Sequence, residues 1–435
     1  MNKMQKFLIL LLSFLCLAGI IPAQAEGTET DWAASIPLNL ASETAKQQVT
    51  VKTFIDGDTV HFIVPESVVP GGVLKARFLA VNTPETTGKI EEYGKKAAAF
   101  TRSRLENAHS IILESETAAW EKDTTGDRYL TWVWYQEAAG QPYRNLNIEI
   151  LQQGLAKPNS SANNRYGDIC MKAIDQSKVR KLNLYSGQKD PDFYYGDAIE
   201  LTLKELRSNP EAYNGKKVAF NGIITVNSNN SVYLESYDAE TDLYFGLSVY
   251  YGYDLNGKGM EILSVGNEAR IVGTMQYYEA GETWQVSGVN YRMIKPTDPN
   301  NIQKLSDGHE PAYVLTAPET FLYGKVTLPG EEFTQEFDYA RLAVATSVEM
   351  KDLLVESIYT TQDANSSSNG AMTLTCKAGE HTIQVRTTPL YDENRALIKA
   401  EAYLGKTIDV KGIVDFFEGA YQIKVFLPSN LIIHP

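Results

Sequence analysis

Cysteine is scarce in this chain, with three residues in 435, at positions 16, 170 and 376. Cys170 falls on a predicted helix and Cys376 on a predicted strand, each among apolar neighbours, so both are expected to be buried thiols of different domains. This distribution disfavours a disulfide between them. An exported protein that avoids cysteine suits a bacterium with little oxidative folding machinery.

Long apolar runs are also missing after the N-terminus, so no later segment is expected to span a membrane. The one run, Phe7 to Ile21, is about 15 residues long, against the ~20 that cross a bilayer. Lys3 and Lys6 precede it, and Ala23-Gln24-Ala25 follows. Residues 1–25 are therefore predicted to be a secretory signal peptide, with a secreted, extracellular product. A membrane anchor is the alternative.

Basic residues are fewer than acidic ones, which gives a formal net charge of −14. The acid is unevenly spread: residues 47–187 hold 17 Lys and Arg against 16 Asp and Glu. Excluding residues 1–25 as well, the remainder holds 21 basic and 38 acidic residues. Any phosphate-binding surface is therefore expected within residues 47–187.

A chain of this length indicates two to four domains. Alternating apolar residues after position 48 predict five strands with helices between them, which suits an OB-type barrel. The expected fold is mainly β, with this helix-packed barrel followed by two OB-like β-barrel domains. The expected boundaries are a flexible lead-in at 26–47, the first domain at 48–187, an OB-like domain at 198–295, a linker at 296–312 and a second OB-like domain at 313–435.

The two downstream domains are predicted from an internal repeat. Residues 266–286 read GNEARIVGTMQYYEAGETWQV, and residues 405–423 read GKTIDVKGIVDFFEGAYQI. Both segments have two glycines seven residues apart, then an aromatic pair with Glu, then a tight Gly turn. This pattern indicates one hairpin in each of two copies of a β-domain.

Five residues of the first domain could carry chemistry: Asp56 and Asp58 in a hairpin turn, Arg77 on a strand, Glu85 beyond that strand, and Arg128 before another. Alone, the turn is a common structural motif, and an arginine among aliphatics is often one half of a structural salt bridge. Together they supply what phosphodiester hydrolysis requires. Arginines and a cation neutralise phosphate charge, and a glutamate orients or deprotonates water.

Several short stretches occur in a fixed order along this domain: DGDTV (56–60), RFLAV (77–81), NTPE (82–85), IEEYG (90–94), KKAAAFT (95–101), ILQQGLAK (150–157) and KLNLYSG (181–187). In this order they resemble the staphylococcal nuclease (thermonuclease) family over about residues 48–187. The resemblance implies Ca²⁺-dependent cleavage of DNA and RNA at the 5′ P–O bond. It implies catalytic roles for Arg77, Glu85 and Arg128, metal ligation by Asp58, Asn82 and the Thr83 carbonyl, and a substrate-binding role for Tyr93 in the nucleotide pocket.

Three departures from the family pattern bear on this expectation. Asn82 stands where the family has an aspartate ligand, which predicts weaker Ca²⁺ binding. The approach to Arg128, from Asp123 to Asp127, is one residue longer and more acidic. The stretch after Lys157 lacks the family's nucleotide-stacking tyrosines, and Tyr166 is the candidate replacement.

Two functions remain open from the sequence. The first is a secreted nuclease acting on environmental DNA or RNA. The second is a binding or scaffold protein whose nuclease-like barrel has lost efficient catalysis, which Asn82 and the altered loop before Arg128 favour. The OB-like domains have abundant aromatics but no basic groove, so protein, glycan and single-stranded nucleic acid are all candidate ligands for them.

Overall fold

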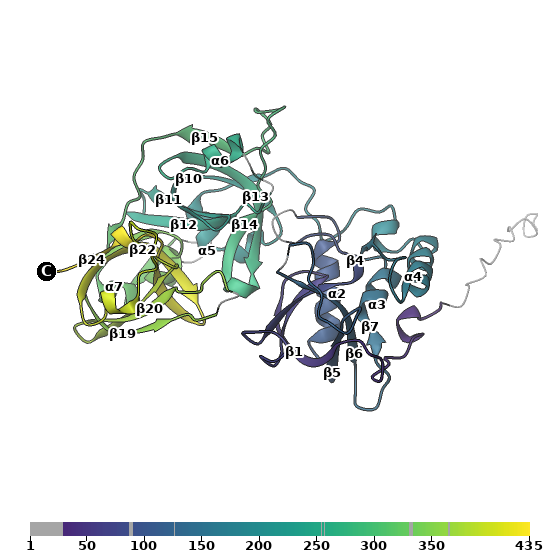
Figure 1. The fold of residues 1–435 in the computed structure, drawn as a ribbon. Coiled ribbons are helices and arrows are strands. Elements are labelled where there is room, and N and C mark those ends of the chain that lie inside the picture. Colours follow the sequence, from purple (N-terminus) through teal and green to yellow (C-terminus); the bar gives the residue numbers. More distant parts are fainter. Residues whose placement is uncertain are drawn as a thin grey trace, which may run out of the picture.

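The computed structural model describes residues 29–86, 90–125, 127–253, 255, 257–329, 334–363 and 366–435. The predicted signal peptide lies outside the described residues. None of the helices in the described ranges has the length and apolar character needed to cross a bilayer. Figure 1 shows two lobes, one formed by the N-terminal barrel and the other by the two barrels that follow.

Strands in the described part close into three five-stranded barrels with the same order, and this confirms the predicted fold class. In each barrel the strands pair in the order first, second, third, fifth, fourth, and the fourth pairs back to the first. The third and fifth strands run parallel in all three, and the other ladders around the barrel are antiparallel. This is the order of an OB barrel.

The strands of the first barrel have one apolar face, which packs into the barrel core. Along β3 every second residue is buried, so Leu74, Ala76 and Phe78 point inward while Arg77 points out of the core. The barrel strands are β1 (Lys46–Phe54), β2 (Thr59–Ile63), β3 (Val73–Phe78), β5 (Ser110–Glu114) and β6 (Tyr129–Gln136).

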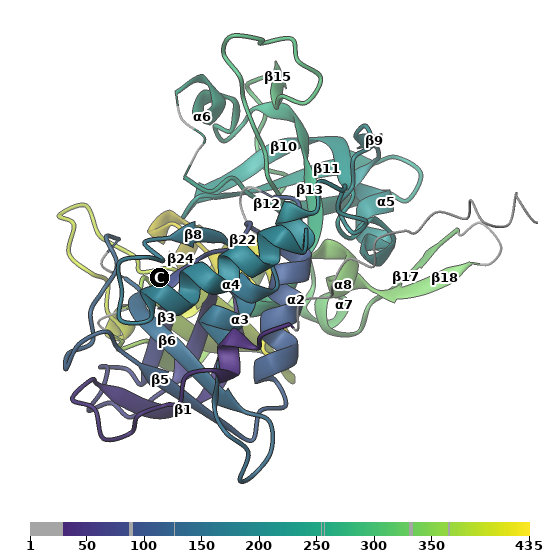
Figure 2. The same cartoon turned by 90° about the vertical axis from the view of Figure 1, so that its right-hand side faces the viewer.

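Three helices lie together on one side of this barrel, as Figure 2 shows. They are α2 (Gly94–Leu105), α3 (Leu146–Gln152) and α4 (Gly167–Val179). Every residue of α3 is buried, because it lies against α4 as well as against β6. The short elements around them are η1 (Trp32–Ala34), β4 (Ala80–Asn82), β7 (Arg144–Asn145), β8 (Lys157–Asn159) and η2 (Asn183–Tyr185).

The lead-in expected to be flexible is packed against the first barrel from residue 29 onward. The Trp32 amide donates to Gln152 Oε1 at 2.7 Å, and Ala33 is fully buried. Lys46 and Gln47 already belong to β1 and pair with β5. The sequence pattern missed this because the contacts of such a short segment are long-range and leave no periodicity.

His61 on β2 gives this domain a predicted acid sensitivity. Burial, together with the nearby positive charges of Lys75 and Lys52, lowers the pKa of His61 to about 4. Between the unfolded pKa near 6.5 and the folded pKa, only the unfolded chain binds the proton, so stability falls as the pH falls through this range. In the wild type, the free energy of unfolding should decrease between pH 7 and pH 4. We expect this decrease to be about 2 kcal/mol smaller in His61→Gln, a value that allows for the partial exposure of His61.

Urea unfolding at a series of pH values measures this effect. The same substitution at exposed His109 controls for the loss of an imidazole. An identical pH dependence in His61→Gln and the wild type would contradict the assignment.

The second barrel is built from β10 (Lys217–Ser228), β11 (Ser231–Asp238), β12 (Leu243–Tyr250), β13 (Glu268–Tyr278) and β14 (Thr283–Ser287). Its further elements are β9 (Ile199–Glu200), α5 (Leu203–Ser208), η3 (Pro210–Tyr213), α6 (Lys258–Ile262), η4 (Glu279–Gly281) and β15 (Gln303–Ser306). Because β15 pairs with β13, part of the segment expected to be a linker, 296–312, extends the sheet of this barrel.

The third barrel consists of β19 (Ser347–Thr360), β20 (Met372–Ala378), β21 (His381–Thr387), β22 (Thr407–Phe417) and β23 (Ala420–Val425). Around it lie β16 (Val314–Leu315), α7 (Pro318–Tyr323), α8 (Tyr339–Ala343), η5 (Ala400–Ala402), η6 (Pro428–Asn430) and β24 (Leu431–Ile433). The paired strands β17 (Lys325–Leu328) and β18 (Gln335–Asp338) extend away from the barrels in Figure 2.

The internal repeat corresponds to the last hairpin of each downstream barrel, β13–β14 and β22–β23. The second glycine of each copy lies where the partner strand crosses closely. A Cβ at Gly273 would lie 2.6 Å from the Ser287 carbonyl oxygen, and one at Gly412 would lie 2.6 Å from that of Lys424. Both repeats therefore need glycine for the same packing reason.

The second and third barrels are held together by a buried carboxylate. Glu235 on β11 accepts hydrogen bonds from the Ala312 amide at 2.9 Å and from the Ser347 amide and hydroxyl at 2.7 and 2.8 Å. A Cβ at Gly246 would lie 2.5 Å from the Ala345 backbone, so the two barrels are in close backbone contact there. These contacts explain why they form one lobe.

Both cysteines of the described part are free and buried, in the first and third cores, as predicted. Burial raises the pKa of Cys170 and of Cys376 to about 12. Neither thiol is therefore suited to nucleophilic or redox chemistry.

Candidate active site on the first barrel

The turn between β1 and β2 brings two aspartates into a buried position. Asp56 and Asp58 are 8% and 3% exposed, and the Asp58 amide donates to Asp56 Oδ1 at 3.0 Å. A Cβ at Gly57 would lie 2.8 Å from the Thr83 side chain and 2.9 Å from Ala97 Cβ. Glycine is needed between the two aspartates because the turn packs directly against α2 and the segment after β4.

Asp58 connects this turn to the segment after β4 and to β3. Its Oδ2 accepts from the Thr83 amide at 2.7 Å, its Oδ1 accepts from Thr59 Oγ1 at 3.1 Å, and its carboxylate forms an ion pair with Arg77. Arg77 lies directly across from Thr59 in the β2–β3 register. The buried carboxylate is therefore compensated by one backbone donor, one hydroxyl and one guanidinium.

Arg77 also holds Asn82, through an Nη2–Oδ1 hydrogen bond of 2.7 Å. One guanidinium thus contacts an oxygen of Asp58 and an oxygen of Asn82. Sequence reasoning expected these two side chains to share a metal ion. In the structure the cationic arginine lies against both of them.

A left-handed residue sets the position of Asn82. Ala80 has a φ of 67°, which turns the chain out of β3 and into β4. The buried Asn147 stabilises this turn by donating to the carbonyls of Leu79 and Thr131 at 2.8 and 3.0 Å. Ser161 also donates to the Ala80 carbonyl, at 2.5 Å. These bonds fix where the segment from Asn82 onward leaves the barrel.

Glu85 is held near the two aspartates by the start of α2. A Cβ at Gly94 would lie 2.5 Å from the Glu85 carbonyl oxygen, so only glycine permits this approach, and the Glu91 amide donates to the same carbonyl at 3.0 Å. Burial and the negative charge of Asp58 raise the pKa of Glu85, and Arg77 opposes the shift. A carboxyl group with a raised pKa is suited to proton transfer.

Asp56 completes a group of three acidic residues; the sequence marked it as a candidate, but the family resemblance assigned it no role. Burial raises the pKa of Asp56 to about 8, and the charges of Asp58 and Glu85 contribute to the rise. Its position two residues before Asp58, across a glycine, was the available sequence signal. Alone, that spacing is too common in turns to identify a site.

Arg128 lies within electrostatic reach of Glu85 and, like Arg77, opposes the rise in the Glu85 pKa. Its own guanidinium is bound to the acidic loop, with Nε 2.8 Å and Nη2 2.7 Å from Asp123 Oδ2. Leu130, two residues later, lies across from Arg77 in the parallel β3–β6 ladder. Arg128 is therefore at the same end of the barrel but is paired with Asp123.

The two candidate nucleotide-binding tyrosines are both engaged by other parts of the protein. Tyr93 is buried at the start of α2, and its hydroxyl donates to the Gln188 carbonyl at 3.0 Å. Tyr166, the candidate stacking residue, packs edge-on against Trp132 with ring centroids 4.9 Å apart. The Tyr166 hydroxyl donates to Glu114 at 3.3 Å, and its ring belongs to the aromatic core beside α4.

The oxygen atoms around Asp58 suit a hard divalent cation. Asp58, Asn82 and the Thr83 carbonyl offer carboxylate, amide and peptide oxygens, the ligands that Ca²⁺ prefers. Burial and the neighbouring Asp58 raise the pKa of both Asp56 and Glu85, and a bound cation would offset this penalty on the charged forms. The buried Thr83 Oγ1 has no hydrogen-bond partner within the described structure, so no protein group there satisfies this hydroxyl.

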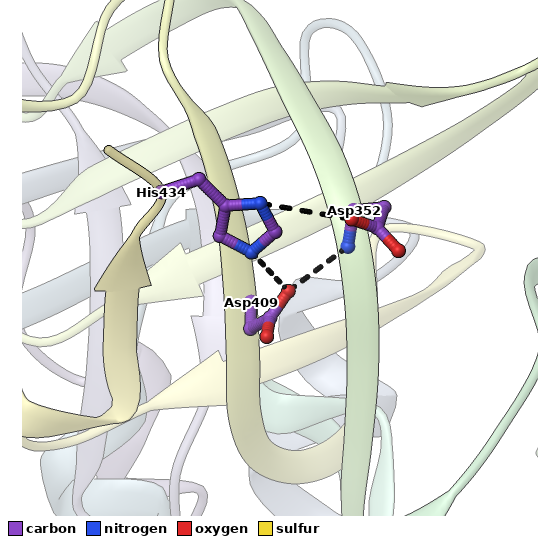
Figure 3. A group of neighbouring side chains, drawn as sticks. All are labelled: Asp352, Asp409 and His434. Atoms are coloured by element: carbon purple, nitrogen blue, oxygen red, sulfur yellow. Dashed lines mark hydrogen bonds and ion pairs between the residues drawn. The ribbon is translucent and has the colours of Figure 1, made fainter.

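A different cluster of potential metal ligands lies on the third barrel (Figure 3). His434 Nε2 is 2.7 Å from Asp409 Oδ1, His434 Nδ1 is 3.6 Å from Asp352 Oδ1, and the Asp352 amide donates to Asp409 Oδ1 at 3.0 Å. Burial raises the pKa of Asp409, but these hydrogen bonds outweigh it, and the net pKa lies below its usual value. The cluster attaches the C-terminal residues to β19 and β22.

A comparison with known protein families matches residues 75–187 to the family model described as "Staphylococcal nuclease homologue". The matched range contains Arg77, Asn82, Thr83, Glu85 and Arg128, and β1 and β2 with Asp58 complete the same barrel outside it. This match supports a nuclease-type or nucleic-acid-binding function for the domain. The chain therefore contains a domain of the staphylococcal nuclease family, followed by two further OB-like barrels.

Proposed function

We propose that this chain is a secreted, Ca²⁺-dependent nuclease that hydrolyses DNA and RNA at the 5′ P–O bond. The observation that carries the proposal is the hydrogen-bonded group formed by Asp58, Arg77, Asn82 and Thr83, with Glu85 in electrostatic contact. This group lies in a barrel most of which matches the staphylococcal nuclease family. Export rests on the predicted signal peptide.

Asp58, Asn82 and the Thr83 carbonyl would hold the Ca²⁺, and Asp56 orients Asp58 by accepting a hydrogen bond from its amide. A bound Ca²⁺ supplies neutralisation of the phosphate charge that grows during the reaction.

The side chains of the domain supply the remaining steps. The ionised Glu85 carboxylate takes a proton from the attacking water, which its raised pKa favours. Arg77 holds two phosphate oxygens through its planar fork once it leaves Asp58 and Asn82. Arg128 provides a second positive charge on the same side of the barrel. The substrate-binding role of Tyr93 rests on its matching position in the family.

The proposal is tested by incubating the purified full chain with single-stranded DNA in Ca²⁺, and in a chelator with Ca²⁺ re-added. We expect degradation in Ca²⁺, loss of degradation with the chelator and recovery on re-addition. Products bearing 3′-phosphates would support cleavage at the 5′ P–O bond. The absence of Ca²⁺-dependent cleavage of both DNA and RNA would refute the proposal.

The second candidate function is a nucleic-acid-binding or scaffold protein with weakened catalysis. It is favoured by the engagement of both arginines, Arg77 with Asp58 and Arg128 with Asp123, and by the neutral Asn82. Oligonucleotide binding without cleavage in Ca²⁺ would support this alternative.

Asn82 also leads to a prediction about metal affinity. We expect Asn82→Asp to bind Ca²⁺ severalfold more tightly, because a charged oxygen replaces a neutral one beside Asp58. Asn82→Ala, which removes the oxygen, should bind more weakly than the wild type. Isothermal calorimetry measures both affinities, and an unchanged affinity in Asn82→Asp would show that this side chain does not bind the ion.

A further inference from the structure

We infer that the second barrel contributes a platform of three tyrosines, Tyr250, Tyr253 and Tyr278, that stacks an unpaired base of the substrate beside Glu85. The active site would then be shared by two domains, and its preferred substrate would be a single strand. This inference rests on the proposed nuclease function and adds the substrate class that the site favours.

The first and second barrels contact each other along α2. A Cβ at Gly215 would overlap the Lys95 ammonium, and Gly215 is hydrogen-bonded to Met275 on β13. Seven residues further along α2, Arg102 forms an ion pair with Glu279. The helix therefore lies beside β13 and the residues that follow it, and in Figure 1 the β13–β14 side of the second barrel faces the first barrel.

This contact between the barrels extends to the Glu85 end of α2. Lys95 directly follows Gly94, the residue packed against the Glu85 backbone. The side of the second barrel that meets α2 is therefore close to the loop that carries Glu85.

The three tyrosines lie on the side of the second barrel that meets α2. Tyr250 ends β12, Tyr278 ends β13 directly before Glu279, and Tyr253 lies in the loop after β12. Tyr253 is 86% exposed, which is far more than a ring used for packing. Tyr250 and Tyr278 are half-buried, so they can support an exposed ring while keeping part of their own surface in solvent.

Electrostatics agree with this placement. Burial raises the pKa of Tyr250, and the groups that raise it further are Tyr253, Tyr278 and Glu85. The Tyr250 hydroxyl is therefore influenced electrostatically by Glu85 of the first barrel and by two tyrosines of its own barrel.

The chemistry of these groups points to a nucleobase as the occupant. Aromatic faces stack on any base, whereas phosphate binding needs cations, and the chain outside residues 47–187 is acidic. Phosphate binding would therefore stay with Arg77 and Arg128 on the first barrel, and the second barrel would contribute ring faces. A base inside a duplex is already stacked and paired, so this arrangement favours single strands.

The inference is tested by binding measurements in the full chain carrying Glu85→Gln, so that the probe stays intact. The probe is a fluorescein-labelled oligothymidylate, and fluorescence anisotropy gives the affinity. We expect Tyr253→Ala to weaken binding by about tenfold, the magnitude typical of one lost base–aromatic stack. Tyr278→Ala should act in the same direction, and Tyr359→Ala, an exposed tyrosine of the third barrel, is the matched control.

Probes with a single abasic position test whether the tyrosines contact a base. With the tyrosines present, one abasic position should weaken binding by a similar factor. In Tyr253→Ala the same abasic position should cost nothing, because the stacking partner is gone. In proteins with Glu85 intact, the preference in kcat/KM for single-stranded over duplex DNA should also fall in Tyr253→Ala.

The outcomes separate this inference from the proposed function. Cleavage by the wild type with unchanged binding in both tyrosine variants would overturn the platform and leave the nuclease intact. Tyrosine-dependent binding without cleavage by the wild type would refute the nuclease and retain the platform. Neither binding nor cleavage would overturn both.

Discussion

Glu85→Gln is expected to lower kcat for single-stranded DNA by about 10³-fold with little change in KM. Glutamine keeps the size and the hydrogen-bonding capacity of the side chain but cannot accept a proton. The Glu85 carboxylate lies near Asp58 and Arg77, in a position fixed by the close packing of Gly94 against its backbone. A loss confined to kcat would show that the carboxylate acts on the reacting atoms.

The pH profile provides a second readout of the same substitution. Because the pKa of Glu85 is raised, wild-type activity should fall as the pH falls through that pKa, since the protonated acid cannot accept the proton of water. The residual activity of Glu85→Gln should lack this acidic limb.

Glu92→Gln is the matched control. Glu92 lies seven residues after Glu85 and is exposed, and the substitution makes the same chemical change there. Equal activity of Glu85→Gln and the wild type would refute Glu85 as the base.

Arg77→Lys is expected to lower kcat by about 10²-fold, although the charge is conserved. A guanidinium can hold two oxygens in parallel, whereas an ammonium acts as a single point charge. Arg77 already holds two oxygens, one from Asp58 and one from Asn82, so its geometry is suited to a phosphate. Steady-state kinetics on a labelled oligonucleotide, with thermal unfolding to exclude misfolding, measure the effect.

Arg128→Lys is the comparison that makes this result specific. We expect a smaller loss, because Asp123 occupies the Arg128 guanidinium and must be displaced before phosphate can bind. If Arg128→Lys were the more damaging change, Arg128 rather than Arg77 would be the principal phosphate ligand.

Much of the fold could be predicted from the sequence because its strands are amphipathic. The strand around Arg77 was predicted, and in β3 the observed alternation buries Leu74, Ala76 and Phe78 and leaves Arg77 outside the core. The repeat predicted two copies of one hairpin, and the close approach at Gly273 and Gly412 shows why both glycines recur. Periodicity and steric demand act over short stretches, so the sequence reports them directly.

The errors concern contacts between segments far apart in the chain. The lead-in expected to be flexible packs through Trp32 onto Gln152, and part of the expected linker forms β15 beside β13. Tyr166 was considered as a stacking residue but belongs to the core with Trp132. A short segment or a single aromatic gives no periodic signal, so only its partners in space decide its role.

The sequence by itself determined the barrel type, the first domain's family resemblance and the order in which Asp58, Arg77, Asn82 and Glu85 occur. These follow from local patterns: alternation along strands, and motifs that each span a few residues. Only the tertiary structure decided that Arg77 lies on both Asp58 and Asn82, that Asp56 joins the acidic group, and that Tyr250 of the second barrel lies within electrostatic reach of Glu85. Electrostatic coupling depends on distance in space, and packing between barrels sets that distance.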